Sequence, residues 1–263
     1  MFNNNFDPVA FTFLIFEIRW YSISYILGIL LGWAYIKKFI IKENTIKILF
    51  DNYISYLIIG IILGGRLGYV LVYNLEYYLS DLIKIIYIWE GGMSFHGGVV
   101  GVIIASYFFC KIHKLNTFTF LDFVSLSAPI GIFFGRLANF LNSELYGRQT
   151  DILWSVKFLK IDNLNRHPSQ IYEAIFEGLI LFIILNFFLK SLIRSPGKIS
   201  CFFLIFYSLF RFIIEFTREP DLQIGLIFKI LSIGQVISIF TLIVGFILYY
   251  FLRNNKNEEK ITY

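Results

Sequence analysis

The sequence is poor in charged residues and in cysteine. Charged side chains make up 16% of its 263 residues, whereas soluble proteins carry about 25%, so the composition excludes an ordinary soluble domain. The two cysteines, Cys110 and Cys201, lie in apolar segments without a disulfide framework or the spacing of metal ligands. We therefore expect both to be buried packing residues.

Two kinds of sequence signal are also absent. The N-terminal residues have no basic region, and their apolar run has no small-residue cleavage site, so we expect no cleavable signal peptide. No internal repeat is present. The net charge of +5 comes from basic residues scattered between apolar runs, a pattern that does not indicate binding to nucleic acid.

Long apolar runs dominate the chain, which is 57% hydrophobic with a mean hydropathy of +0.70. The first 20 residues alternate in places and end at Arg19-Trp20-Tyr21, as in an interfacial arm that leads into a membrane span. Because about 20 apolar residues cross a bilayer, the sequence predicts an all-α integral membrane protein, a bundle of about seven transmembrane helices that forms one domain over residues 1–263. The seven spans are expected near 21–37, 53–73, 93–112, 119–139, 170–190, 199–217 and 231–252.

Basic residues predict the orientation of these spans. Twelve of the 23 lysines and arginines follow the first, third, fifth and seventh spans: Lys37, Lys38, Lys42, Lys47, Lys111, Lys114, Lys190, Arg194, Lys198, Arg253, Lys256 and Lys260. The positive-inside rule places these regions in the cytoplasm, with the N-terminus outside and the C-terminus inside. The connection at about 143–169 then faces outward as a small head segment, in which residues 152–158 are expected to join a short strand pair. The last ten or so residues have the composition of a solvated polar tail.

Small residues recur at four-residue spacing in three of the spans. They are Gly60, Gly64 and Gly68; Gly97, Gly101 and Ala105; and Gly131 and Gly135. Such faces let membrane helices approach closely and favour a compact bundle.

One polar stretch stands out at the end of the fourth span. An arginine near the hydrocarbon region costs about 2.5–3.5 kcal/mol on insertion scales and normally has a functional partner. Arg136 is followed one helical turn later by Asn139, on the same helical face. The pair predicts a polar site suited to an anionic headgroup. The alternative is a helix end whose arginine extends to water.

Other polar groups are predicted to lie in the same outer half of the membrane. Tyr207, Arg211, Glu215 and Arg218 follow one face of the sixth span, Arg66 is followed by Tyr69 and Tyr73, and His96 lies between glycines at the start of the third span. Each has a simpler interpretation, since Arg211 and Glu215 can form a structural ion pair and a single histidine can be a hydrogen-bonded structural residue. Polar groups from four spans at one depth nevertheless predict a site there.

Six motifs resemble, in order, those of the prolipoprotein diacylglyceryl transferase family. Residues 135–148 match the pattern G-R-x-x-N-F-x-N-x-E-x-x-G-R, and the one departure noted is Tyr146, where tryptophan is expected in many members. The other motifs are Arg19-Trp20-Tyr21 with Tyr25, Gly64-Gly65-Arg66-Leu67-Gly68-Tyr69, the run 92–98, His167-Pro168-Ser169-Gln170-Ile171-Tyr172-Glu173, and the run 210–221.

The resemblance implies a seven-span enzyme of the bacterial inner membrane that acts at the periplasmic face. Its substrates would be phosphatidylglycerol and the lipobox cysteine of a prolipoprotein; a thioether would form and glycerol phosphate would leave. A thiol must lose its proton to become the nucleophile. Fixed guanidinium groups stabilise the charge that develops on a departing phosphate.

The resemblance also implies a role for each motif residue. Arg136 with Asn139 would bind the lipid phosphate and headgroup, Arg211 oriented by Glu215 would hold the leaving phosphate, and His96 is the candidate general base. The residues expected to line the pocket or brace the arginines are Tyr25, Arg66, Tyr69, Asn142, Glu144, Gly147, Arg148 and Tyr207. No metal or cofactor is expected, because one histidine and scattered carboxylates do not form a ligand set.

Two other classes of function stay open at this point. A transporter or channel for small anions or lipids would also contain glycine-lined faces and buried arginines, but it would carry polar residues into the inner half of the bundle, where Thr119, Asp122 and Ser125 are the few present. A non-catalytic lipid-binding scaffold would not require His96 among the arginines.

Overall fold

The computed structural model describes residues 2–14, 16–220, 226–227 and 231–254. The predicted polar tail with Lys256 and Lys260, and Asp221 at the end of one motif, lie outside the described residues. The described chain forms two compact units, the first containing residues 2–36 and those from Asp122 onward, the second containing residues 37–121. The prediction of one domain over the whole chain stays a prediction.

Among the residues that the structure describes, seven helices are long and apolar enough to span a membrane, as the sequence predicts. The second begins at Asn44 and not near 53, because residues 44–52, which mix polar and apolar side chains, belong to the same helix. The spans are Trp20–Ile40, Asn44–Val72, Phe95–His113, Thr117–Leu141, Ser169–Phe188, Lys198–Thr217 and Ile233–Arg253.

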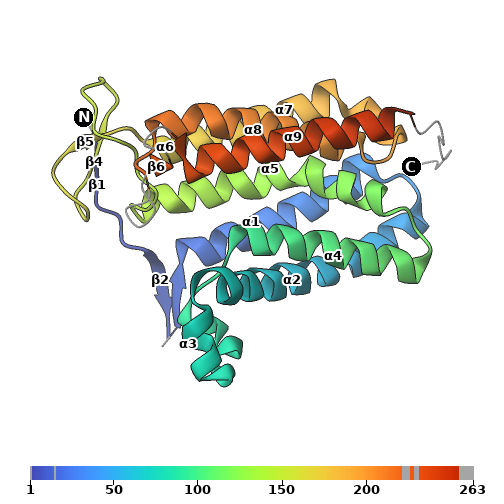
Figure 1. Ribbon diagram of the computed structural model, residues 1–263, viewed down its shortest axis with the longest axis horizontal. Coiled ribbons are helices and arrows are strands. Elements are labelled where there is room, and N and C mark those ends of the chain that lie inside the picture. The colour runs from blue at the N-terminus through green and yellow to red at the C-terminus, as the bar shows by residue number, and fades with distance from the viewer. Residues whose placement is uncertain (1, 15, 221–225, 228–230, 255–263) are drawn as a thin grey trace. The chain divides into compact units, whose positions relative to one another are not determined.

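The helices are labelled in Figure 1. They are α1 (Trp20–Tyr35) continued by η1 (Ile36–Ile40), α2 (Asn44–Tyr73), α4 (Phe95–His113), α5 (Thr117–Leu141), α8 (Lys198–Ile214) continued by η7 (Glu215–Thr217), and α9 (Ile233–Asn254). The fifth span combines α6 (Ser169–Glu173), the π-helical η4 (Ala174–Ile180), α7 (Leu181–Ile183) and η5 (Ile184–Phe188). Short helical segments are α3 (Leu75–Ser80), η2 (Leu82–Ile86), η3 (Ile88–Glu90) and η6 (Lys190–Arg194).

Glycines join α2 and α4 in the second unit, where the two helices lie side by side (Figure 1). A Cβ atom at Gly60 would lie 2.6 Å from the carbonyl oxygen of Gly101, and one at Gly68 would lie 2.7 Å from Cα of Gly97. Only hydrogen fits at these contacts, so the small-residue faces predicted in α2 and α4 are confirmed as a helix interface. The prediction does not extend to Gly135 of α5, where an added Cβ would have no atom of the described residues outside its own helix within 4 Å. Cys110 is buried in this unit and Cys201 in the first, and both are free thiols as expected.

In the first unit, Asp122 joins α5 to the start of α8. Its carboxylate accepts hydrogen bonds from the backbone N–H groups of Gly197 and Ser200, each at 2.7 Å, and from the Ser200 hydroxyl at 2.6 Å. These groups are the free donors at a helix N-terminus, so a buried carboxylate satisfies them. At another contact in this unit, a Cβ at Gly28 of α1 would lie 2.8 Å from Cα of Gly131 in α5.

Short strands complete the first unit. The predicted strand pair is confirmed as β4 (Val156–Phe158) and β5 (Asn165–Arg166), which are antiparallel, and β1 (Phe2–Asn4) adds to β4 in parallel. The outward placement of this segment stays a prediction. Two further antiparallel pairs are β2 (Val9–Phe13) with β3 (Phe16–Arg19), and β6 (Leu226–Ile227) with β7 (Leu231–Ser232).

Candidate functional site

Three arginines and three glutamates of the first unit form one ion network, which we call the buried network. Their side chains are between 0 and 17% exposed. With every arginine protonated and every glutamate ionised, the six charges sum to zero. The members are Arg136 of α5, Glu173 of α6, Glu177 of η4, Arg211 of α8, Glu215 of η7, and Arg218.

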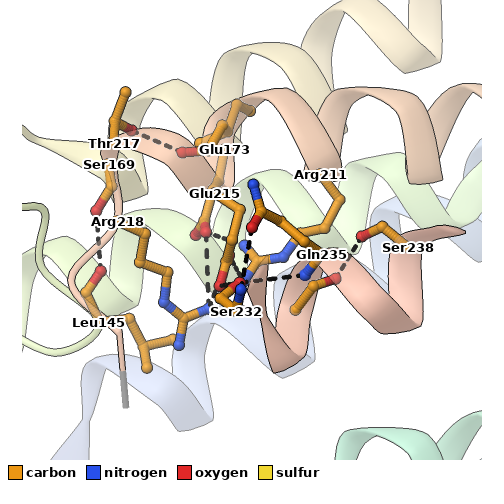
Figure 2. Close-up of polar contacts among 12 residues, drawn as sticks. Leu145, Ser169, Glu173, Arg211, Glu215, Thr217, Arg218, Ser232, Gln235 and Ser238 are labelled. Atoms are coloured by element: carbon orange, nitrogen blue, oxygen red, sulfur yellow. Dashed lines mark hydrogen bonds and ion pairs between the residues drawn. The ribbon is translucent and has the colours of Figure 1, made fainter. Parts of the chain in front are cut away.

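Glu173 lies at the centre of the buried network. Its Oε2 atom lies 3.1 Å from Nη1 of Arg136, and its Oε1 atom accepts a hydrogen bond from Nη1 of Arg211. Nη1 of Arg218 lies 4.0 Å from the same Oε1 atom. Figure 2 shows Glu173, Arg211 and Arg218 converging, with Glu215 between them. One carboxylate therefore bridges the two arginines that the sequence assigns to phosphate.

Glu177 lies one helical turn after Glu173 and has fewer contacts. Its Oε2 atom accepts a hydrogen bond of 3.1 Å from Nη2 of Arg136. Its Oε1 atom lies 3.6 Å from Nη1 of Arg211, beyond hydrogen-bonding distance. Both glutamates are 0% exposed, and removing one partner of such a buried pair typically costs 3–5 kcal/mol.

Arg211 is oriented by Glu215, as the four-residue spacing suggests. Nη2 of Arg211 lies 2.7 Å from Oε2 of Glu215. The other oxygen of Glu215 accepts a hydrogen bond of 2.9 Å from the Ser232 hydroxyl, which Figure 2 also draws. A Cβ at Gly234 would lie 2.5 Å from Oε1 of Glu215, so glycine is required beside this carboxylate.

Asn139 belongs to a second cluster of polar side chains, beside the buried network. Its amide donates hydrogen bonds to the Tyr21 hydroxyl and, at 3.4 Å, to Glu144. Tyr21 in turn donates to Glu144 at 2.6 Å. Asn142 also donates to Glu144, at 3.4 Å, and the exposed Tyr25 ring stacks on Tyr21. The structure thus joins Asn139, Asn142, Glu144 and Tyr25 through Tyr21, a residue to which the sequence analysis gives no role.

Gly147 and Arg148 attach the segment after α5 to the end of α8. The Arg148 backbone N–H donates to the Thr217 carbonyl at 2.9 Å, and its side-chain Nε donates to the Arg218 carbonyl at 2.9 Å. A Cβ at Gly147 would lie 2.8 Å from the Thr217 carbonyl oxygen. Both residues therefore fix the backbone that carries Arg218, and their role in the site stays a prediction.

Arg166 of β5 extends this bracing into the strand segment. Its guanidinium donates to Asp162 at 2.6 Å, to the Gly147 carbonyl at 3.1 Å and to Glu219 at 3.1 Å. The hydrogen bonds from Arg166 hold the pKa of the Asp162 carboxyl below its usual range. Nearby, burial lowers the pKa of His167.

Tyr207 is the remaining predicted site residue of the first unit. Its ring lies parallel to Phe203 at 5.7 Å between centroids. The phenol is within electrostatic range of Glu177, Arg136, Arg211 and Glu173. Tyr207 therefore faces the buried network, as the shared helical face with Arg211 predicts.

Arg66, Tyr69 and His96 lie in the second unit. The buried Arg66 guanidinium donates to five carbonyl oxygens, so all five of its N–H groups are used to order residues 84–92; the acceptors are Lys84, Ile85, Tyr87, Gly91 and Gly92. A Cβ at Gly92 would lie 2.5 Å from the Tyr69 ring, so this residue must be glycine for the ring to pack. His96 is the second residue of α4, whose first turn is capped by the Ser94 hydroxyl.

Glu173 and Glu177 are members of the site that were not predicted from the sequence. The sequence does contain a signal for them. Two acidic residues four positions apart in an apolar run require buried partners of opposite charge. Glu173 appears in one of the motifs, whereas Glu177 lies beyond it. Within the part of the chain that the structure describes, no group of three His, Cys, Asp or Glu side chains is arranged to hold a metal ion.

Comparison with known proteins gives one consistent result. Residues 8–251 match the family described as prolipoprotein diacylglyceryl transferase. A phosphatidylglycerol–prolipoprotein diacylglyceryl transferase of Rickettsia bellii (strain OSU 85-389) is 52% identical over 245 residues, which are 92% of this chain and 93% of the relative. The protein of the same name from Ehrlichia canis (strain Jake) is 46% identical over 260 residues, 97% of this chain and 98% of the relative.

Proposed function

The chain belongs to the prolipoprotein diacylglyceryl transferase family and is a multi-pass membrane transferase of lipoprotein maturation, and on that premise we propose how it performs the transfer. The substrates are phosphatidylglycerol and a prolipoprotein, as in the names of its relatives. The group transferred is diacylglyceryl, and its acceptor is the thiol of the lipobox cysteine.

The reaction forms one bond and breaks one. The thiolate sulfur attacks the glyceryl carbon that carries the phosphate ester, a thioether forms, and the carbon–oxygen bond to phosphate breaks. Glycerol phosphate leaves with the bonding electrons. Two groups must therefore be supplied: a base that takes the thiol proton, and fixed positive charge at the departing phosphate.

Arg136 and Arg211 supply the positive charge in this proposal. The observation that carries the assignment is that Glu173 bridges the two guanidinium groups inside a membrane-spanning bundle. A guanidinium binds two phosphate oxygens through a planar pair of N–H groups, and each Nη atom that contacts one carboxylate still has a second N–H. His96 is the proposed base for the thiol. Arg66, with its donors directed to carbonyl oxygens, acts by ordering its loop.

We place this site at the periplasmic face of the inner membrane. The support is the distribution of basic residues, which assigns the start of α5 and α8 to the cytoplasm and their arginine-bearing ends to the outside. Phosphatidylglycerol would enter from the outer leaflet of that membrane.

Transport of small anions is not supported. That function would use the polar groups at the opposite end of α5 as part of a pathway. Asp122, the acidic residue there, instead accepts three hydrogen bonds at the start of α8.

The proposed function is tested with purified protein, phosphatidylglycerol and a lipobox peptide. Mass spectrometry should detect a peptide that has gained one diacylglyceryl group, with release of glycerol phosphate. A peptide with serine in place of the lipobox cysteine is the matched control and should stay unmodified. An unmodified cysteine peptide, under conditions in which a relative modifies it, would overturn the proposal.

A further inference from the structure

The charge of the buried network does not match the charge of the proposed ligand. Its three arginines are balanced by three glutamates, so the fully ionised network has no net positive charge for a phosphate diester. A phosphate bound there would add one uncompensated negative charge to a buried site, which is strongly unfavourable in surroundings of low dielectric. A proton on one of the carboxylates would remove the mismatch.

The contacts of the three carboxylates differ in a way that selects one of them. Each has one buried oxygen with no hydrogen-bond partner among the described residues: Oε2 of Glu173, Oε1 of Glu177 and Oε2 of Glu215. For Glu173 and Glu215 that atom still lies 3.1 Å and 2.7 Å from an arginine nitrogen. For Glu177 that atom lies 3.6 Å from Nη1 of Arg211, beyond hydrogen-bonding distance.

Glu177 is therefore the carboxylate whose negative charge is least compensated by nearby arginine nitrogens and hydrogen bonds. Glu173 contacts all three arginines, and Glu215 contacts Arg211 and Ser232. The groups that face Glu177 are Arg136 from α5, Tyr207 and Arg211 from α8, and Glu173 from its own span. A neutral carboxyl group would keep the hydrogen bond from Arg136 to Oε2 and place its proton on Oε1.

We propose that Glu177 is the charge-adjusting positioning residue of the site, taking up a proton on Oε1 when the phosphate of phosphatidylglycerol binds to Arg136. The proton comes from water on binding and returns to water when the product phosphate leaves, so no other bond changes. The network then carries one net positive charge against one negative phosphate diester. This inference rests on the proposed function for the identity of the ligand.

The direct test is infrared difference spectroscopy on the purified wild-type protein without peptide. Adding phosphatidylglycerol should produce the carbonyl-stretch band of a protonated carboxylic acid, which shifts in heavy water whereas the bands of the lipid's own ester carbonyls do not, and Glu177→Gln should lack this shifting band. A neutral zwitterionic lipid, phosphatidylcholine, is the matched control and should produce no band that shifts in heavy water. The absence of the band in the wild type, or its persistence in Glu177→Gln, would overturn the proposal.

A kinetic test uses two isosteric variants one helical turn apart. Glu177→Gln mimics the protonated residue, so its loss of transfer activity should be much smaller than that of Glu173→Gln, which removes the charge between Arg136 and Arg211. Because lipid and proton bind together, KM for phosphatidylglycerol in the wild type should rise about tenfold per pH unit above neutrality. In Glu177→Gln it should not change over that range.

Equal loss in both variants, or a KM in Glu177→Gln that keeps the wild-type pH dependence, would contradict the role. The infrared experiment needs no turnover, so it separates this inference from the proposed function. A band without any transfer would retain the proton assignment and reject the reaction. Transfer without a band would retain the reaction and reject the proton assignment.

Discussion

At the scale of single residues, the proposed mechanism gives Arg136 both a structural and a chemical task. It forms ion pairs with Glu173 and Glu177, so its replacement by alanine is expected to destabilise the fold as well as abolish activity. Arg136→Lys separates the two effects, since lysine keeps the charge but cannot bind two phosphate oxygens in one plane.

We expect Arg136→Lys to unfold near the wild-type temperature and to lose about 10²-fold or more in kcat. Transfer to the lipobox peptide and thermal unfolding in detergent measure the two quantities. Arg194→Ala, at an exposed arginine of η6, is the control and should change neither. Near wild-type transfer by Arg136→Lys would show that the planar guanidinium is not needed.

His96→Ala tests the proposed base. At neutral pH only a few per cent of a free thiol is ionised, so removal of the imidazole should reduce the rate strongly. Near pH 9 the peptide thiol ionises without assistance, because its pKa is about 8.5. His96→Ala should then recover much of the difference from wild type, whereas Arg136→Lys should not. A deficit of His96→Ala that is constant with pH would assign the imidazole to orientation.

The sequence predicted some of these residues better than others. Arg136, Arg211 and Glu215 were recognisable because a charge in an apolar run at helical spacing is unusual. Asn139 was assigned to the same ligand as Arg136, yet its amide donates to Tyr21 and Glu144. Tyr21 belongs to α1, more than 100 residues before Asn139, and no local pattern indicates such a contact.

At the scale of elements, the contact between α2 and α4 depends on glycine. A Cβ at Gly101 would overlap the carbonyl oxygen of Gly60, so Gly101→Ala should force the helices apart and cost about 1–3 kcal/mol. Gly98, three residues earlier in α4, is the matched control because its nearest neighbour would be 3.9 Å away.

Unfolding followed by circular dichroism in detergent compares the two variants. Gly101→Ala should unfold at a lower temperature than the wild type, and Gly98→Ala should unfold at the same temperature or higher, since alanine favours the helix. Equal behaviour of both variants would show that the glycine contact does not limit the stability of the second unit.

The strand segment of the first unit should weaken in acid. Arg166 holds the pKa of Asp162 below its usual range, so this pair stabilises the fold fully above the unfolded value of about 3.9. The contribution is lost as pH falls below that value and through the folded pKa. Protection of the β4 and β5 amides from hydrogen exchange, taken relative to the intrinsic rate at each pH, should fall there in the wild type and be less dependent on pH in Asp162→Asn. An unchanged pH dependence in this variant would rule out the pair as the cause.

The helices followed from the sequence more completely than the strands did. Apolar length located the seven spans found among the described residues, because each is a local property of about 20 residues, although the second begins at Asn44 and not near 53. The parallel pairing of Phe2–Asn4 with Val156–Phe158 was not predicted. It joins segments more than 150 residues apart, and short parallel strands have no distinctive local pattern.

At the scale of the whole molecule, the predicted topology can be tested with introduced cysteines. Cys110 and Cys201 are 0% and 1% exposed, so the natural protein should give little background with a maleimide that cannot cross the membrane. Lys160→Cys, in the strand segment, should be labelled in intact cells. Glu43→Cys, between the first two spans, should be labelled only after the membrane is permeabilised. The opposite pattern would place the site on the cytoplasmic face.

The hydrogen bonds of Asp122 also set a common starting point for the two arginine-bearing helices. Arg136 lies 14 residues after Asp122, and Arg211 lies 14 residues after Gly197, which Asp122 binds. At 1.5 Å per residue, each arginine is about 21 Å along its helix from that shared point. One residue inserted into either stretch would turn its arginine by about 100° and break the match at Glu173. Residues 122–136 and 197–211 therefore place the two arginines at equal distances from Asp122. We expect an insertion or deletion tolerated in one of these segments to be accompanied by a change of the same length in the other.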